Sequence, residues 1–256
     1  MAATITTQKI QLPYPGSAEP ELILTTGPCR VRFGTTDEDL WVTGTYDDPS
    51  GVLPLEVTSG DRTAITQRFE PTLFSGAAMP RLELSFGKSR PFALEVRAGA
   101  SENVFDLGGL PLSRVVVKVG AGRFDLDWSA PNPGTLSLID ISAGAGAITA
   151  RRLANANFAT LRFGGGMAAC TFDFGGALRR DARVRIDSGL GSVDITVPSA
   201  TAATVRAKAF AAARRATGTF TVRGDEYLTQ PAADGVHPLL EIDVSLAFGA
   251  LNLATT

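Results

Sequence analysis

The chain has 256 residues, with 24 Lys and Arg against 26 Asp and Glu, which gives a formal net charge of −2. That balance disfavours a general nucleic-acid-binding protein, which normally carries a clear basic excess. Hydrophobic residues make up 44% of the chain and charged residues 20%, so a folded core is expected. Two cysteines and one histidine are too few for a dense disulfide framework or a zinc cluster of the usual ligand types.

The amino-terminal segment gives a first expectation about location. The first ten residues are polar and contain no apolar run of the kind found in secretory signals, and no stretch of about 18 apolar residues follows anywhere. The sequence therefore predicts a cytoplasmic protein that does not insert into a membrane and that could reach the envelope only through a partner. Cys29 and Cys170 are expected to be reduced, buried thiols.

Residues 1–91 are predicted to form an amino-terminal β segment. The run LILTTGPCRVRF, from Leu22, joins two alternating apolar runs through a glycine-containing turn, which is typical of a strand–turn–strand corner. Residues 35–91 contain three further strand-like runs, LWVTGTY, LPLEV and TAITQRF, separated by turn signals. We expect them to form hairpins that close one end of the fold.

Residues 92–256 contain an internal repeat. Alternating runs meet at glycine-rich turns in LEVRAGASENVFDL, VVVKVGAGRFDLDW, SLIDISAGAGAITA, TLRFGGGMAACTFDF and VRIDSGLGSVDITV, and again in the terminal IDVSLAFGALNL. The last residues before the first five turns advance by 21, 22, 22 and 23 positions; they are Ala98, Val119, Ile141, Phe163 and Ile186. Stacked coils of this length bury a core that one coil cannot bury alone. The pattern predicts an all-β fold, a right-handed parallel β-solenoid (β-helix) with coils of about 22 residues and irregular β caps at both ends; a β-sandwich is the alternative.

Aligning these turns assigns a facing to each side chain. Val119, Ile141, Phe163 and Ile186 are predicted to form one buried stack. One exposed row on one sheet is predicted to be mainly basic, and it is the candidate interaction surface: Arg97, Lys118, Arg162 and Arg185. A second exposed row, with Asp106, Asp127 and Asp194, is expected on another sheet. The basic row is either a solvated face that limits aggregation or a binding ladder for an anionic polymer.

The repeat loosens after Pro198. The alanine-rich stretch from Ala207 to Ala216 is compatible with a short helix or with a distorted coil, inside a loop excursion near residues 208–238. The last run, from Leu246, is expected to leave an apolar edge that is covered by the segment after Pro198 or by another chain. The predicted partner is therefore an unknown protein, or a second copy bound through a solenoid end. The two segments, 1–91 and 92–256, are expected to form one continuous domain.

Catalytic, cofactor and metal sites are not predicted. The glycine turns lack the spacing of phosphate-binding loops, and Asp-containing copies about 22 residues apart cannot supply a calcium site. Asp106, Asp125 and Asp127 are close enough to be considered as a hydrolytic carboxylate pair, but outward Asp residues on strands are also what solubility requires. His237, the only histidine, is interpreted as an ordinary loop residue.

The whole pattern resembles a known family. The segments LEVRAGASENVFDLGGLPLSRVVVKVGAGRFDLDW, IDISAGAGAITARRL, FGGGMAACTFDFGG and IDSGLGSVDITVP, together with ELILTTGPCRVRFG and LWVTGTYDDPSGVLPLEV, resemble bacterial toast-rack β-helical proteins. These are related to the carboxy-terminal domains of LiaF-type cell-wall-active antibiotic response proteins and to candidate adhesins. The resemblance implies a non-enzymatic scaffold or interaction module linked to cell-envelope stress or adhesion, and carries no catalytic residues. The alternative is a polysaccharide-binding or carbohydrate-active β-helix protein.

Overall fold

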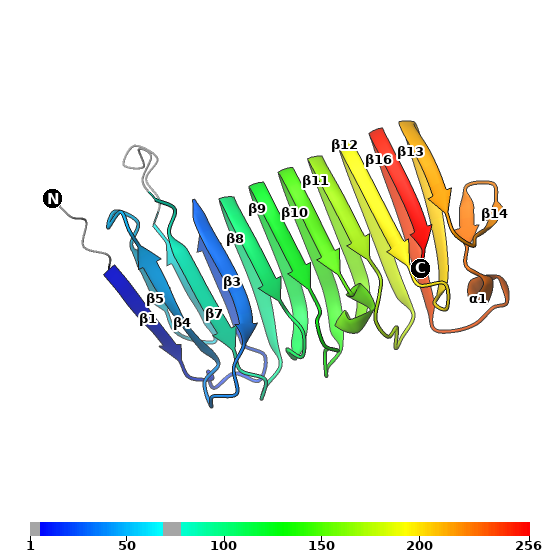
Figure 1. Cartoon of the computed structure of the whole chain (residues 1–256). Helices are drawn as coiled ribbons and strands as arrows, with labels where there is room; N and C mark the ends of the chain where they lie inside the picture. The colour runs from blue at the N-terminus through cyan, green and yellow to red at the C-terminus, as the bar shows by residue number, and fades with distance from the viewer. Residues whose placement is uncertain (1–5, 69–77) are drawn as a thin grey trace.

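The computed structural model describes residues 6–68 and 78–256, which form one continuous, nearly all-β sheet (Figure 1). The last residue of the predicted run TAITQRF, Phe69, lies outside the described residues. Residues 1–5 also lie outside them. The shorter strands are β1 (Thr6–Leu12), β2 (Glu21–Thr26), β3 (Cys29–Thr35), β4 (Val42–Asp48), β5 (Leu55–Thr58), β6 (Arg62–Gln67), β7 (Arg81–Phe86), β14 (Thr221–Arg223) and β15 (Glu226–Leu228). The long strands are β8 (Phe92–Asp106), β9 (Leu112–Asp127), β10 (Leu136–Arg151), β11 (Phe158–Asp173), β12 (Ala182–Val197), β13 (Ala202–Thr217) and β16 (Leu239–Thr255). Two short helical turns, η1 (Leu153–Ala156) and α1 (Gln230–Ala233), lie in connections.

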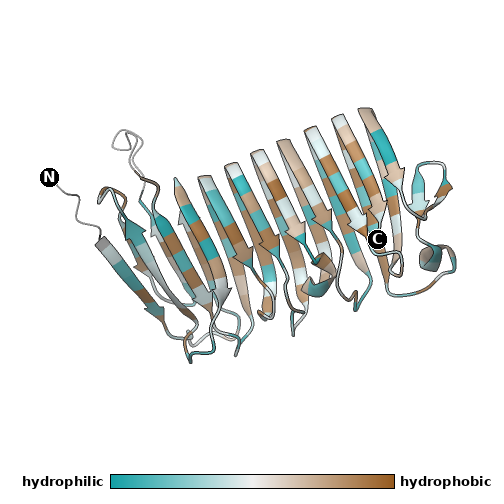
Figure 2. Ribbon diagram, in the orientation of Figure 1, coloured by the Kyte–Doolittle hydropathy of each residue, from teal (hydrophilic) through white to brown (hydrophobic). Residues whose placement is uncertain are grey.

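Each long strand has two arms that meet at a corner, which contains glycine in every long strand except the alanine-rich β13. We call the residues before the corner the first arm and those after it the second arm. Buried and exposed residues alternate along both arms, as Figure 2 shows in the banding of hydrophobic and hydrophilic positions. Because neighbouring strands are parallel and in register, side chains of the same facing stack on one another from strand to strand.

The register differs from the predicted alignment by two residues at one step. Ile141, Phe163 and Ile186 do stack and are buried, but the residue that pairs with Ile141 is Val117, and Val119 pairs with Ala143. The register therefore advances by 24 residues from β9 to β10, where the predicted step was 22. A slip of two residues leaves every side chain on its original face, so apolar alternation alone cannot detect it.

Glycines at the corner fix the register. Gly122 pairs with Gly146, and both have positive φ, 126° and 133°. A Cβ atom on Gly146 would collide with the carbonyl oxygen of Gly122. Since only glycine adopts this backbone without strain, the corners align glycine with glycine rather than valine with isoleucine.

At the amino-terminal end, the order of the strands in the sheet differs from their order in the sequence. β2 and β3 lie beside the two arms of β8, and β6 and β7 cover their outer edges. β5, β4 and β1 then complete this end with antiparallel pairs. The strands predicted in LWVTGTY, LPLEV and TAITQRF are present as β4, β5 and β6.

The carboxy-terminal end repeats this arrangement. β16 lies between β12 and β13, so the segment after Pro198 covers the edge of the last run, as one of the two alternatives predicted (Figure 1). Residues 208–217 are the rest of strand β13 and not part of a loop or a helix, because they pair in parallel with β16 along their length. The excursion that remains contains β14, β15 and α1, and β15 pairs with β13 only at Thr204–Arg206.

Candidate interaction surfaces

The predicted basic row is two rows in the structure. Arg97 and Lys118 are exposed and adjacent, and their row continues through Ser142 and Gly164. Arg162 and Arg185 are also exposed and adjacent, but they belong to the neighbouring row, in which Asp140 precedes them. All four lie on the first arms, as predicted, but the two-residue slip in register divides them.

Acidic residues lie among these cations. The Glu95 carboxylate is buried and accepts hydrogen bonds from Arg97 Nε at 2.8 Å and Lys118 Nζ at 3.4 Å. Burial acts to raise the pKa of Glu95, but the hydrogen bonds and charges of Arg97 and Lys118 outweigh it and hold that pKa below its ordinary value. Arg185 pairs with Asp187, with Nε 2.6 Å from Oδ2. The first arms therefore present alternating charges and not a uniform positive ladder.

The predicted acidic row is divided in the same way. Asp106 pairs in register with Asp127 on the second arms, whereas Asp194 lies in the neighbouring row, which also contains Asp125. This places the three predicted acidic residues on the opposite arm from the basic ones, as expected.

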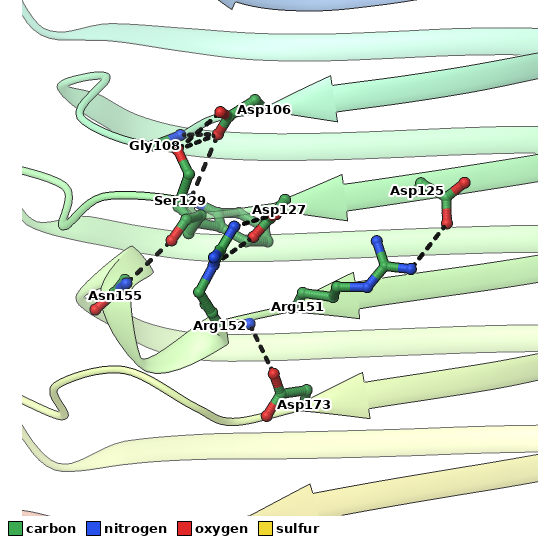
Figure 3. A network of polar contacts seen from close by, with 10 residues as sticks. Asp106, Gly108, Asp125, Asp127, Ser129, Arg151, Arg152, Asn155 and Asp173 are labelled. Atoms are coloured by element: carbon green, nitrogen blue, oxygen red, sulfur yellow. Dashed lines mark hydrogen bonds and ion pairs between the residues drawn. The ribbon is translucent and has the colours of Figure 1, made fainter.

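The carboxylates that could have formed a hydrolytic pair are engaged in a polar network between strands (Figure 3). Asp106 accepts hydrogen bonds from the Gly108 amide at 3.0 Å and from Ser129 Oγ at 2.6 Å. Asp127 receives the Arg152 guanidinium, with Nε 2.9 Å from Oδ1. These hydrogen bonds join the end of one strand to the connection that follows the next strand, which is a structural role.

Asp125 is held similarly but more deeply. It is buried on the second arm of β9, 2.7 Å from Arg123 Nε and 3.7 Å from Arg151. A general acid needs a carboxyl group that is free to exchange a proton with substrate. Asp106 and Asp127 are bonded to residues of the connections, and Asp125 pairs with Arg123 on its own strand and with Arg151 on β10, so the arrangement supports a structural function for all three.

The two cysteines and the histidine are not arranged as a catalytic site in the described residues. Cys29 and Cys170 are buried and unbridged, as predicted, and burial raises the pKa of both thiols to about 12. Such thiols are not reactive nucleophiles. His237 is exposed, with Nδ1 3.0 Å from Asp181 Oδ1. Within residues 6–68 and 78–256, no group of three His, Cys, Asp or Glu side chains is placed to hold a metal ion.

A groove runs along the corners on the side of the first arms. Two open, shallow hollows of about 810 Å³ and 650 Å³ share Gly164, and glycine is the most frequent residue in the lining of each. We call these hollows together the corner groove. The larger one lies towards the carboxy-terminal end, where Asp187, Lys208 and Phe210 line it.

A row of exposed apolar side chains follows the corner, next in sequence to Gly166, Gly189 and Ala247, which line the larger hollow. Met167, Leu190 and Phe248 pair successively in register at the middle position of the corner, and their exposed fractions are 61%, 50% and 51%. We call these three residues the apolar ridge. Beside them Phe210 is 90% exposed. This surface was not predicted from the sequence. Its signal is the residue at the middle of the corner, which is alanine in β9 and β10 but Leu190 in β12 and Phe248 in β16.

A family model matches the amino-terminal part of the chain. Residues 4–151 match the model described as "N-terminal domain of toast_rack, DUF2154". The chain therefore belongs to the toast-rack family, as the resemblance implied. No curated protein matches it.

Solved structures give a consistent comparison of fold. A "putative cell adhesion protein" from Clostridium sporogenes is 15% identical, with 99% of this chain and 100% of that chain covered and a TM-score of 0.52. A "putative adhesin" from Bacteroides fragilis is 5% identical over 98% of this chain and 97% of that chain, with a TM-score of 0.35. At these identities the first comparison supports a shared fold. In the part of the chain that the structure describes, no helix has the length and apolar character needed to cross a bilayer.

Proposed function

We propose that this chain is a non-enzymatic interaction module, built as a right-handed β-solenoid with coils of about 22 residues and closed at each end by irregular β segments. Its role is similar to that of toast-rack proteins linked to adhesion or to cell-envelope stress. The observation that carries the proposal is the exposed corner, where a glycine-floored groove lies beside the apolar ridge. Contiguous exposed apolar surface of this kind is typical of interaction sites.

The electrostatic arrangement supports the same function. Asp106 and Asp127 bond to Ser129 and Arg152, which follow the next strand, and Asp125 pairs with Arg123 on its own strand. Both thiols are buried, and burial raises their pKa. A hydrolase of polysaccharides needs two free carboxyl groups facing a common cleft. None of these three carboxylates lines the corner groove; the two that do, Asp187 and Asp225, pair with Arg185 and Arg214.

Cosedimentation with isolated bacterial envelopes tests this proposal. The purified chain is mixed with cell walls and with membrane vesicles, pelleted, and quantified in both fractions, while soluble reducing ends are assayed in the supernatant. We expect retention on one envelope fraction without release of reducing ends. Release of reducing ends by the wild-type chain would favour the carbohydrate-active alternative, and failure to bind any fraction would overturn an envelope role.

A further inference from the structure

The carboxy-terminal part of the corner carries a knob and a hollow in one patch. Phe210 occupies the corner position that is Ala247 in β16 and Gly189 in β12, and its side chain is 90% exposed. The hollow of about 810 Å³ next to it is floored by Gly165, Gly166 and Gly189. A projecting aromatic ring beside a glycine-floored depression is suited to contact with another copy of the same surface, because each copy supplies both shapes.

Charges of both signs lie along the first-arm wall of this hollow. Asp187 on β12, Ser245 on β16 and Lys208 on β13 are successive register neighbours, so Asp187 and Lys208 lie one strand to either side of β16. Phe210 and Gly189 also lie one strand to either side of β16. Both complementary pairs are therefore centred on the same strand.

We propose that two copies of this chain dimerise face to face through the corner, with the two-fold axis lying along the corner of β16. A two-fold axis in this position exchanges β12 of one copy with β13 of the other and keeps the order of positions along each strand. Phe210 then enters the hollow above Gly189 of the second copy, and Lys208 faces the second copy's Asp187. Phe248, on the axis, faces its own counterpart.

Other occupants of the corner are less consistent with these observations. A membrane surface would use the ridge, but it gives no reason for an acidic Asp187 beside a basic Lys208 at matched positions. A uniform anionic polymer meets the same objection. This dimer rests on the proposed interaction role, and a chain that binds envelopes as a monomer would overturn the dimer alone.

Sedimentation equilibrium across a concentration series measures the mass directly. We expect twice the chain mass for the wild type and the monomer mass for Phe210→Asp, with Val104→Asp as a matched control on the second arm of β8, where Val104 is exposed outside the patch. Circular dichroism and thermal melting verify that each variant is folded. A wild type that remains monomeric at every concentration would overturn the proposal, as would dimers that persist in folded Phe210→Asp.

Two further variants test the position of the axis. Lys208→Asp and Asp187→Lys should each weaken the dimer, and the double exchange should restore it. Phe248→Cys should form an intermolecular disulfide under mild oxidation, since the axis brings this position next to itself, while Met167→Cys should not. Efficient crosslinking at 167 with none at 248, or no rescue in the double exchange, would refute this axis. Loss of vesicle binding in Phe210→Asp from a monomeric wild type would assign the patch to a membrane instead.

Discussion

The two ends of the strand stack solve the same problem differently. At both ends, strands distant in sequence enclose those beside the regular stack: β2 and β3 lie between β8 and the later β6 and β7, and β16 lies between β12 and the earlier β13. The amino-terminal end is finished by packed aromatic and polar residues. The carboxy-terminal end is finished by an alanine-rich strand.

At the amino-terminal end several buried polar groups form hydrogen bonds with one another. Tyr46 donates a hydrogen bond to the Leu53 carbonyl oxygen at 2.5 Å and accepts one from Gln67 Nε2 at 3.0 Å. Asp48 accepts from the Leu53 amide at 2.7 Å, and Trp41 is fully buried against Phe92. This end is closed by packing.

At the carboxy-terminal end an arginine replaces a core residue. Arg214 pairs in register with buried Leu251, but its Nη1 donates to the Ala207 carbonyl oxygen at 3.0 Å and to Asp225 at 2.8 Å. It therefore joins the second arm of β13 to the first arm and to the following turn. A charged side chain at an edge strand also discourages further strand addition. One end is therefore closed by packing, while the other uses charge at the edge strand and leaves Phe210 exposed.

The largest expected difference between the two ends comes from truncating an aromatic residue at each. Trp41→Ala should lower the free energy of unfolding by about 3–5 kcal/mol, since it leaves a cavity in a packed region. Phe210→Ala should change it by less than about 0.5 kcal/mol because the ring is exposed. Urea titration of each variant, at a concentration where the oligomeric state is fixed, measures both. Equal losses would contradict the difference between the ends.

Between the two ends, the corners contain glycines that should differ in how well they tolerate a side chain. Gly146→Ala should cost about 1–3 kcal/mol through backbone strain, and more if the collision with Gly122 is not relieved. Gly164→Ala, at a position with no atoms within 4 Å of a new Cβ, is the matched control and should be nearly neutral. Thermal unfolding of both variants measures the difference. Equal losses would show that the corner needs flexible glycines in general and not glycine at the positions that fix the register.

The polar side chains at the two ends should also contribute differently to stability. Tyr46→Phe should cost about 1–3 kcal/mol, because the buried Leu53 carbonyl oxygen and Gln67 amide lose a partner. Arg214→Ala removes an exposed ion pair and should cost about 0–1 kcal/mol. A larger loss at Arg214 than at Tyr46 would show that the arginine, and not the packing, limits stability.

The amino-terminal half should also be the more sensitive to acid. Burial opposes ionisation of Asp48, but hydrogen bonds from Ser50 and the Leu53 amide hold its pKa below the ordinary value, and Glu95 is lowered by Arg97 and Lys118. A carboxyl group with a lowered folded-state pKa stabilises the fold above its unfolded pKa, about 4, and loses that contribution as the pH falls through the folded value. Glu95→Gln should therefore flatten the decline in unfolding free energy below about pH 4. An unchanged acid limb would contradict this assignment.

The smallest effect is expected on the exposed first-arm cations. The double reversal Arg162→Glu with Arg185→Glu should change stability by about 0–1 kcal/mol per residue, since both are exposed. Binding to heparin or teichoic acid, measured in low and high salt, gives the functional readout. If wild type binds either polymer and the double variant does not, the cations are a binding surface rather than a solvated face.

Much of this architecture could be predicted from the sequence because it depends on local alternation. The strands of the repeat, the corners, the first copy from Leu22 and the buried thiols follow from period-two patterning and from glycine at sharp bends. The exposed positions of Arg97, Lys118, Arg162 and Arg185 follow from the same alternation.

Tertiary structure decided the features that alternation cannot specify. A two-residue slip preserves facing, so the pairing of Ile141 with Val117 depended on the contact between glycine corners in adjacent strands. The position of β16 between β12 and β13 depended on backbone pairing between segments far apart in sequence. Composition had left a short helix or a distorted coil open for the stretch from Ala207 to Ala216, and pairing with β16 makes it part of strand β13. The burial of Glu95 beneath Arg97 and Lys118 and the alignment of Met167, Leu190 and Phe248 into one ridge arise in the same way, because they require neighbouring strands to be in place.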